Sequence, residues 1–428
     1  MIQVSNKKLC CGCSACAERC PRQCISMKED EEGFLYPVVD ETACVKCNVC
    51  DAVCPIINVN APTQPVEVFA AVHKDEQIRK RSSSGGVFTA LAEKTIRKGG
   101  VVFGARFDKN WRVVHTSTET KEGLTAFRGS KYVQSLIGNS FLQVEKYLKA
   151  DKLVLFTGTP CQVAGLKRFL RKEYDNLLTV DVICHGVPSP LIWSRYVDTI
   201  RPKGVAGENS VSSLKEIPVI TDILFRDKTA GWRKYGFSVW KGATEGSDEN
   251  TVFPPKSSKK EIFEIQQENL YLRGFLQNLF LRPSCHHCRF RNFKSGSDMT
   301  IADFWGVEKV MPDFNDDKGM NLVILKNEKY KSLFKEMDLK IGIVSSSNYA
   351  LAFKGNSSLF YDDKANPNRD DFFSQFIQNP ESLCDLIERY TVYTDYIRKR
   401  TKLDHLLIKL GIYDVVKYLV LIIRRIKK

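Results

Sequence analysis

The chain has 428 residues, of which 43% are hydrophobic and 27% are charged. This is the composition of a folded protein with room for two or three domains, and it excludes disorder as the general state. The net charge of +14 fits either an ordinary basic surface or attraction to an acidic partner, such as a small acidic electron carrier, an anionic membrane or an anionic substrate. We expect no nucleic-acid partner, because no basic run is interleaved with aromatic residues and no nucleic-acid motif occurs.

The N-terminal sequence, MIQVSNKKLCC, has neither the apolar core nor the cleavage site of a secretory signal. No window approaches the length of apolar sequence that a membrane-spanning helix needs. These features predict a cytoplasmic protein. In a reducing compartment, the fifteen cysteines are expected to be metal ligands or buried thiols rather than disulfides.

Two runs of cysteines share one spacing. The pattern C-x2-C-x2-C-x3-C-P occurs over residues 10–21 and again over residues 44–55, an internal repeat with an offset of 34 residues. It is the spacing of bacterial ferredoxins with two 4Fe–4S clusters, in which the fourth cysteine of each run binds the other cluster. We therefore expect an α+β ferredoxin-like module with one cluster on Cys10, Cys13, Cys16 and Cys54 and a second on Cys44, Cys47, Cys50 and Cys20.

Zinc explains these runs less well than iron–sulfur clusters do. A structural zinc site takes four ligands, usually as two C-x2-C pairs, and does not need a third cysteine followed by C-P in both runs. A disulfide scaffold does not suit a reducing compartment. Cys11 and Cys24 lie outside the spacing, and we interpret them as small buried hydrophobic side chains.

Beyond this module the chain alternates strand-like and helix-like segments. Residues 59–67 have the proline and polar content of a linker. The apolar patterns predict strands and helices in alternation, which indicates an α/β domain. The expected strands are 67–74, 101–107 and 112–118, and the expected helices are 82–100, with a serine N-cap and Gly99 as terminator, and 139–149.

Residues 152–200 are predicted to form strand, helix, strand and helix, with the first strand apolar on both faces like a central parallel strand. Cys161 and Cys184 each follow the carboxyl end of one of these strands. If the strands are neighbours, both cysteines lie at the sheet edge where open α/β sheets bind ligands. Cys161 also lies at a helix N-terminus, which favours its thiolate.

A later C-x2-C pair, Cys285 and Cys288, would complete four ligands with Cys161 and Cys184 for a third cluster. The alternative is that Cys161 and Cys184 are core thiols and that the pair binds zinc or nothing.

Residues 246–260 are a polar loop without a functional signal. Residues 403–428 predict an apolar and basic helix, which either packs with a solvated basic end or lies on an anionic membrane or in a partner's groove.

Seven phrases between residues 65 and 325, in order, resemble the family of coenzyme F420 hydrogenase/dehydrogenase beta subunits. They are SSSGGVFTALAEKTI, GSKYVQS, VLFTGTPCQVAGL, VDVICHGVPSP, FRDKTAGW, LFLRPSCHHCRF and SDMTIADFWG. With the preceding cysteine runs, the chain resembles the bacterial branch that carries a fused two-cluster ferredoxin. The resemblance implies a flavoprotein that binds FAD beside an iron–sulfur cluster, and it favours the third cluster on Cys161, Cys184, Cys285 and Cys288.

The same resemblance implies which residues contact the flavin: Ser84, Gly85, Gly86, Gly129, Ser130, Lys131, Thr157, Gly158 and Asp303. These residue types suit the role, because a glycine pair that opens a helix lets a phosphate approach backbone N–H groups, and Lys131 can neutralise a pyrophosphate or a reduced flavin. No G-x-G-x-x-G fingerprint follows a strand, so a nicotinamide site of that kind is not supported. His185, His286 and His287 flank the expected ligands, and His185 joins Lys131 as a catalytic candidate because imidazole titrates near neutrality.

These features predict four regions: a ferredoxin module (1–60), the two parts of the flavin domain (61–150 and 151–325), and an α/β extension with the C-terminal helix (326–428). The expected function is electron transfer between a one-electron carrier, such as an acidic ferredoxin, and FAD, then to an organic acceptor or a deazaflavin coenzyme. The resemblance associates such proteins with cell-surface polysaccharide synthesis. The alternative is a non-catalytic electron-transfer subunit or scaffold for a partner enzyme, with contact to the inner face of the membrane through the last helix.

Overall fold

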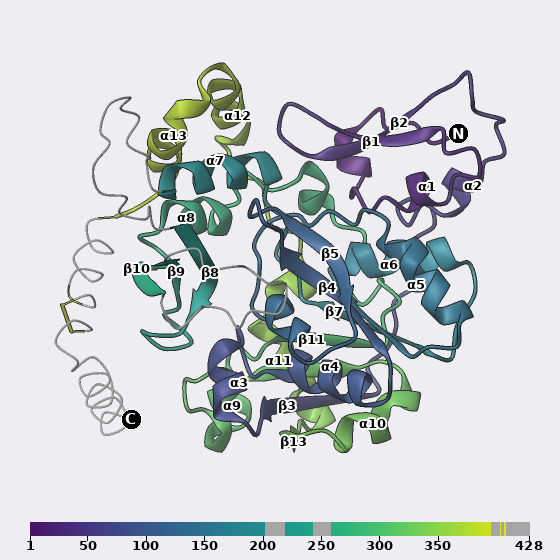
Figure 1. The fold of residues 1–428 in the computed structure, drawn as a ribbon. Coiled ribbons are helices and arrows are strands. Elements are labelled where there is room, and N and C mark those ends of the chain that lie inside the picture. Colours follow the sequence, from purple (N-terminus) through teal and green to yellow (C-terminus); the bar gives the residue numbers. More distant parts are fainter. Residues whose placement is uncertain (202–218, 243–257, 395–402, 404–405, 408–428) are drawn as a thin grey trace, which may run out of the picture.

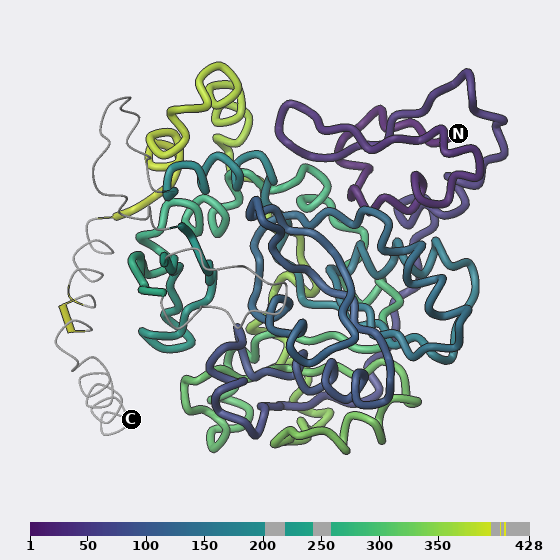
Figure 2. The backbone as a smooth tube through the Cα atoms, in the orientation of Figure 1, coloured from purple at the N-terminus to yellow at the C-terminus, as the bar shows by residue number. Residues whose placement is uncertain are grey.

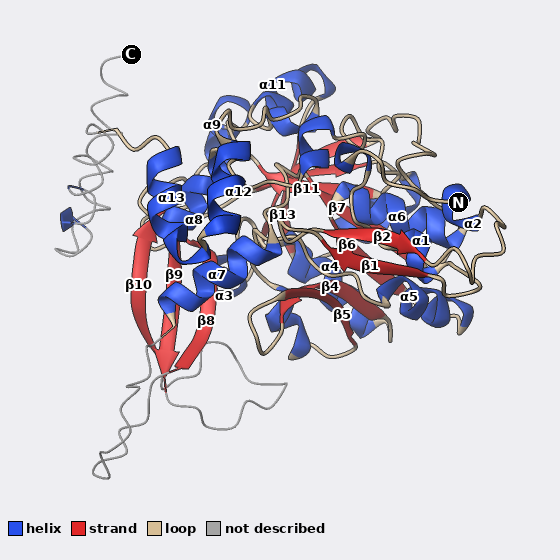
Figure 3. Ribbon diagram, turned by 90° about the horizontal axis from the view of Figure 1, so that it is seen from above, coloured by secondary structure: helices blue, strands red, loops and turns tan. Residues whose placement is uncertain are grey.

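The computed structural model describes residues 1–201, 219–242, 258–394, 403 and 406–407 (Figures 1 and 2). The N-terminal segment, residues 1–60, lies at the upper right of Figure 1 against a body built on one large sheet. A second, smaller sheet lies on the other side of this body, as the view from above shows (Figure 3).

The 34-residue repeat of the sequence is also a repeat of backbone conformation. Each cysteine run contains one short helix, and the residue before each helix has a left-handed backbone, with φ of 64° at Ser14 and 59° at Asn48. A β-hairpin separates the two helices, with Ile25 opposite Val39. The elements of this segment are α1 (Ala15–Glu18), β1 (Ile25–Glu29), β2 (Leu35–Val39) and α2 (Val49–Ala52).

The large sheet has eight strands in the order β13-β3-β12-β11-β7-β6-β4-β5. Its centre is parallel, from β11 through β7 and β6 to β4, and the outer strands pair in antiparallel fashion. The parallel centre places several strand ends at one edge, where ligands bind in such sheets. The strands are β3 (Glu67–His73), β4 (Val101–Phe107), β5 (Val113–Thr118), β6 (Val154–Gly158), β7 (Leu177–Val182), β11 (Met299–Asp303), β12 (Asn321–Leu325) and β13 (Leu339–Ile343).

Helices cover both faces of this sheet. Alternate residues of β3 enter two different cores: Phe69 packs with α4 and α10 on one face, and Val68 packs with α9 and α11 on the other. The second face continues over β4, β6 and β7, where α5 and α6 pack. The covering helices are α3 (Glu76–Arg81), α4 (Val87–Arg97), α5 (Ser140–Lys149), α6 (Pro160–Leu170), α9 (Val307–Val310), α10 (Lys331–Lys335) and α11 (Tyr349–Lys354).

The smaller sheet, in the order β10-β9-β8, has an aromatic core of its own. Trp193 lies at its centre, with ring centroids 4.9 Å from Phe225 and 5.0 Å from Tyr271. Four helices pack against it. The elements of this layer are α7 (Pro190–Ile200), β8 (Val219–Asp227), β9 (Gly236–Gly242), β10 (Lys259–Ile265), α8 (Leu270–Leu276), α12 (Arg369–Gln378) and α13 (Leu383–Tyr390).

The predicted strands and helices between residues 67 and 200 are confirmed within a few residues, including the parallel neighbours β6 and β7. The predicted serine N-cap of α4 is wrong. The cap is Gly86, whose φ is 91°, a conformation that glycine adopts without strain. Ser84 instead donates its hydroxyl to the carbonyl of Met320. Gly99 follows the last turn with a φ of 73°, as the terminator prediction requires.

Two predictions fall largely outside the described residues. The C-terminal helix over 403–428 and most of the polar stretch over 246–260 belong to the undescribed ranges. Among the helices that are described, none is both long and apolar enough to cross a membrane. The strands of the large sheet come from residues 67–343, so this sheet continues across the boundaries predicted at residues 150 and 325.

Candidate functional site

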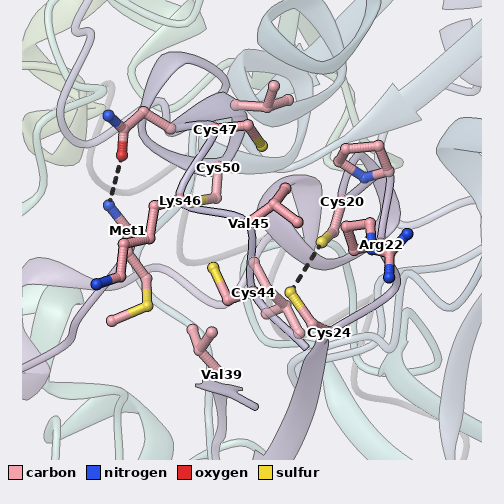
Figure 4. A pocket seen from close by; sticks show the side chains of 14 residues that line it. Met1, Cys20, Arg22, Cys24, Val39, Cys44, Val45, Lys46, Cys47 and Cys50 are labelled. Atoms are coloured by element: carbon pink, nitrogen blue, oxygen red, sulfur yellow. Dashed lines mark hydrogen bonds between the residues drawn. The ribbon is translucent and has the colours of Figure 1, made fainter. Parts of the chain in front are cut away.

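Five cysteines surround a small cavity at the far end of the N-terminal segment (Figure 4). Four of them are the predicted ligands of the second cluster, and we call these the distal cage: Cys20, Cys44, Cys47 and Cys50. The fifth is Cys24, whose sulfur lies 3.4 Å from that of Cys20. Cys24 is buried, as the sequence analysis expects, but it also touches a predicted ligand.

The predicted ligands of the first cluster also lie together, and we call them the middle cage: Cys10, Cys13, Cys16 and Cys54. Burial raises the pKa of Cys16 to about 12, and the neighbouring thiols of Cys10 and Cys54 act in the same direction. Cys50 of the distal cage raises it further, so the two cages are neighbours. Gly165 of α6 makes this approach to the body possible, since a Cβ there would lie 2.9 Å from the Cβ of Cys13.

Four more cysteines line a cavity at the carboxyl edge of the large sheet, and we call them the proximal cage: Cys161, Cys184, Cys285 and Cys288. Burial raises the pKa of Cys184, and the thiols of Cys285, Cys161 and Cys288 raise it further. The structure brings these four side chains together, because β6 and β7 are neighbours and the segment around residue 285 lines the same cavity.

Cys161 is the second residue of α6, as predicted, but the helix N-terminus does not lower its pKa. A hydrogen bond with Cys11 and desolvation raise the pKa of Cys161 well above its usual value, and they outweigh the contact with the hydroxyl of Thr159 at 3.1 Å. Cys11 also contacts Cys13. The side chain interpreted as a small core residue thus lies between the middle and proximal cages.

The residues present fit iron–sulfur clusters. All fifteen cysteines are free thiols, although twelve of them gather in three groups. Buried thiols held this close together are stable as thiolates only around a bound cation, and cysteine is the usual ligand of iron–sulfur clusters. Among the residues that the structure describes, no three His, Cys, Asp or Glu side chains are placed to hold a single metal ion.

A cavity of about 530 Å³ opens beside the proximal cage. This volume is in the usual range of small-molecule sites. It is lined by eight of the nine residues that the resemblance implies for the flavin: Ser84, Gly86, Gly129, Ser130, Lys131, Thr157, Gly158 and Asp303. The ninth, Gly85, lies outside the lining. A Cβ there would lie 2.5 Å from the carbonyl oxygen of Ala71, so Gly85 permits close packing on β3.

One loop separates the proximal cage from the large cavity. Residues 184–187 follow β7 and line both spaces. Within this loop the Nδ1 of His185 lies 3.5 Å from Asp363, and its ring stands edge-on to Phe275 at 5.1 Å. His286 hydrogen-bonds the carbonyl of Asp363 instead, and His287 is exposed. Of the three histidines, His185 is therefore the one that touches both the cage and the cavity.

Lys131 lies in the recess of the cavity. Its Nζ donates to the carbonyls of Arg128, at 3.0 Å, and Gly129, at 3.1 Å. Burial lowers its pKa to about 8, against the opposing effect of the Asp222 carboxylate. Lys131 is consequently a cation at neutral pH, placed to meet an anionic group of a ligand.

Arg226, which has no role predicted from the sequence, also lines the cavity. Its Nη1 is 2.7 Å from Asp303, and its guanidinium lies 4.0 Å above the ring of Tyr235. The indole N–H of Trp232 donates to the other carboxylate oxygen of Asp303 at 3.0 Å. The ring of Trp232 stacks on that of Trp305, with the ring centroids 4.6 Å apart. The phrases FRDKTAGW and ADFWG contain these residues except Tyr235, but nothing in their spacing reveals that they meet.

The segment 355–358 completes the cavity wall and lies far along the chain from every predicted contact. The two aspartates that follow it hold the proximal cage. Asp362 accepts from the backbone N–H of Cys288 at 3.1 Å and from Arg291 at 2.9 Å, and Asp363 pairs with Arg291 at 3.0 Å. No sequence signal marks this segment, because its residues act only through contacts made in the fold.

Two family models match the chain. Residues 68–141 match the N-terminal region, and residues 151–346 the C-terminal region, of the beta subunit of coenzyme F420 hydrogenase/dehydrogenase. Together the matches cover more than half of the chain.

Single relatives are more distant. The chain is 23% identical over 203 residues to one of the subunits of the F(420)H(2) dehydrogenase of Methanosarcina mazei, over 43% of this chain and 55% of the relative. It is 25% identical over 206 residues to an uncharacterized protein of Methanocaldococcus jannaschii, over 41% and 56% of the two chains. The chain thus spans about half the length of the curated relatives that it matches.

A chain from the solved structure of the xenon-derivatised F420-reducing NiFe hydrogenase complex of Methanosarcina barkeri aligns with a TM-score of 0.41 at 15% identity, over 70% of this chain and 90% of that one. The family models match the body that carries the proximal cage and the large cavity. The protein belongs to the family of coenzyme F420 hydrogenase/dehydrogenase beta subunits, which are iron–sulfur redox proteins.

Proposed function

We propose that the protein is an oxidoreductase that moves electrons between a one-electron carrier and an organic molecule in the large cavity. The observation that carries this proposal is the continuity of four sites. The distal and middle cages are neighbours, Cys11 contacts the middle and proximal cages, and residues 184–187 line both the proximal cage and the large cavity. Such a series of sites gives electrons a buried path from the surface to a ligand.

Three 4Fe–4S clusters would supply one-electron steps along this path, and FAD in the large cavity would convert them to two-electron chemistry. The distal cage would be held by Cys20, Cys44, Cys47 and Cys50. The middle cage would be held by Cys10, Cys13, Cys16 and Cys54, and the proximal cage by Cys161, Cys184, Cys285 and Cys288.

The chain's own residues would bind and orient the flavin. Ser84, Gly86, Gly129 and Ser130 line the cavity and would offer backbone groups to the flavin, and Lys131 would offer a cation. Asp303 is already bound by Arg226 and Trp232, so we assign it the role of fixing the Arg226 side chain rather than binding the ligand directly.

His185 is the candidate proton donor to a ligand in the large cavity. It lines the cavity, and Asp363 orients its ring through Nδ1. The expected result for His185→Ala is slower turnover with the iron and flavin contents unchanged. Unchanged turnover would remove His185 from the mechanism.

An acidic ferredoxin-type protein is the proposed carrier, because the chain is strongly basic and Cys47 of the distal cage is exposed. The organic acceptor would be a deazaflavin coenzyme or a precursor in cell-surface polysaccharide synthesis. Recording the flavin spectrum during titration with reduced ferredoxin, reduced deazaflavin and NADH separates the donors, since the functional donor bleaches the flavin.

The test of the proposal is anaerobic reconstitution followed by measurement of iron, sulfide and flavin per chain. Three four-iron clusters correspond to about twelve irons. The variant Cys161→Ser should lose about four of them, whereas Cys384→Ser is the matched control, because Cys384 lies on α13 outside the three cages. A flavin-free preparation would refute the catalytic role.

The second candidate function is a non-catalytic electron-transfer subunit. It is favoured by the name of one relative, which is a subunit of a larger dehydrogenase. In that case the reconstituted chain would carry iron and take up electrons but would reduce no acceptor until a partner is added, and a pull-down would recover that partner.

A further inference from the structure

Arg282 occupies the junction between the N-terminal segment and the body, and it is fully buried, with 0% of its surface exposed. Its Nε donates to the carbonyl of Cys10 at 2.8 Å, and its Nη2 donates to the carbonyl of Leu35 at 2.9 Å. Its Nη1 donates to Oε1 of Gln134 at 3.0 Å. One guanidinium therefore holds the first cysteine loop, the β-hairpin and the body together.

These three acceptors are neutral. Among the ion pairs of the described residues, none involves Arg282. The other deeply buried arginines near the site have carboxylate partners: Arg226 pairs with Asp303, Arg291 with Asp362 and Asp363, and Arg369 with Glu32. A buried cation without a counter-charge is costly, so Arg282 needs an anion close by.

The cages lie on two sides of this guanidinium. Arg282 bonds the backbone of Cys10 in the middle cage, and it lines the cavity of the proximal cage, three residues before Cys285. Cys161 and Cys285 line the same cavity, and the backbone N–H of Cys285 donates to the carbonyl of Arg282 at 2.9 Å. Four thiolates around an iron–sulfur cluster carry a net negative charge, and that charge would be the missing counter-anion.

We propose that Arg282 is the shared counter-cation of the middle and proximal clusters, and that it raises the reduction potentials of both. This inference rests on the proposed function, because it requires the two clusters to be present. Taking up one electron adds one negative charge to a cluster, and a fixed cation beside it stabilises that reduced state. The same cation offsets the repulsion between two anionic clusters that are close together.

The side chains and the space around the guanidinium suit an arginine better than any other residue type. The guanidinium lies 4.3 Å above the ring of Tyr36 and 5.3 Å from that of Phe34. Gly12 leaves room for it, since a Cβ there would lie 2.8 Å from Nη1. A planar fork that stacks on aromatic rings and donates in three directions is specific to arginine.

The test is an EPR-monitored redox titration of the reconstituted full chain, with iron counted in every preparation. We expect Arg282→Gln to lower the potentials of the middle and proximal clusters and to leave the distal cluster unchanged. Arg79→Gln is the control, a buried arginine that pairs with Asp316 and lines neither cysteine-lined cavity, and it should shift none of the three potentials.

A second variant changes the charge without removing the arginine. Gln134→Glu places a carboxylate against Nη1 with almost the same shape, so it should neutralise Arg282 and lower the same two potentials. Unchanged potentials in iron-loaded Arg282→Gln and Gln134→Glu would overturn the role of Arg282 while the proposed function stands. A wild-type chain that takes up no iron would overturn the proposed function itself, and this inference with it.

Discussion

Among the contacts that hold the N-terminal segment to the body, the buried ion pair between Glu32 and Arg369 has an effect on docking that can be predicted. Glu32, in the turn between β1 and β2, pairs with Arg369 of α12 through both oxygens, the first at 2.9 Å and the second at 2.5 Å. The two side chains are only 14% and 8% exposed. Arg369 also donates to the carbonyl of Leu281, so it is fixed from the body side.

Glu32→Gln removes one charge and leaves the arginine buried. Breaking a buried pair from one side costs about 3–5 kcal/mol. Glu32 is slightly exposed and Arg369 keeps its bond to Leu281, so we expect a loss of about 2–3 kcal/mol, which is about a 30- to 150-fold increase in opening of the docked turn.

The neighbouring Glu31 provides the matched control. It pairs with Lys7 at 2.7 Å, but the two side chains are 59% and 40% exposed. Pairs of this kind contribute at most about 1 kcal/mol. Glu31→Gln should therefore change the same measurement by less than about fivefold.

Hydrogen exchange at the amides of Gly33 and Phe34 measures this opening. Both residues are buried, and both amides also donate to Asp30 in the same turn, so exchange needs the turn to lift from the body and these bonds to open. The bonds to Asp30 are common to both variants, so a difference in exchange rate between them reports on docking. Equal exchange rates in Glu31→Gln and Glu32→Gln would refute the reasoning, because burial would then not decide the strength of the pair.

Three further outcomes are expected. Lys131 loses its positive charge as pH rises through its pKa of about 8, so the affinity for flavin should fall about tenfold between about pH 7 and pH 9 in the wild type. Flavin fluorescence measures this affinity, which should stay constant in Lys131→Arg. A wild-type affinity that does not change with pH would contradict the prediction. Gly165→Ala should lower the free energy of unfolding by about 1 kcal/mol, seen as a lower melting temperature, and should reduce iron loading, because the clash with Cys13 outweighs the gain in helix propensity. A higher melting temperature with full iron loading would show that helix propensity outweighs the clash. Cys24→Ser should keep its full iron content, and a loss of iron would make Cys24 a ligand.

The sequence was sufficient to predict those elements that depend on residues close together in the chain. The strands and helices from residue 67 to residue 200 follow apolar periodicity, and the two cysteine runs follow fixed spacing. The meeting of Cys161 and Cys184 also followed from local information, because two parallel neighbouring strands end at one edge. The serine cap of α4 failed for a local reason too, since a left-handed backbone at the helix start selected Gly86 instead.

The remaining parts of the site depend on contacts between distant segments. Asp363 reaches His185, Arg226 reaches Asp303, and Arg282 reaches Cys10. No periodicity or spacing encodes these pairs, because each is created only when separate elements pack. Cys11 is buried, as its position outside the ligand spacing led us to expect, but its contact with Cys161 could not be predicted, because it forms only when the first cysteine loop meets the start of α6.

The loop over residues 184–187 also limits how such a protein can change over evolutionary time. It is a wall shared by the proximal cage and the large cavity, so a substitution there alters the electron relay and the ligand site at once. Arg226 lines the large cavity but not the cavity of the proximal cage, whereas Ser358 is bonded to Asp363 and to Arg291 beside that cage. Substitutions around Arg226 can therefore change which acceptor fits with less effect on electron transfer than substitutions in residues 184–187 or at Ser358.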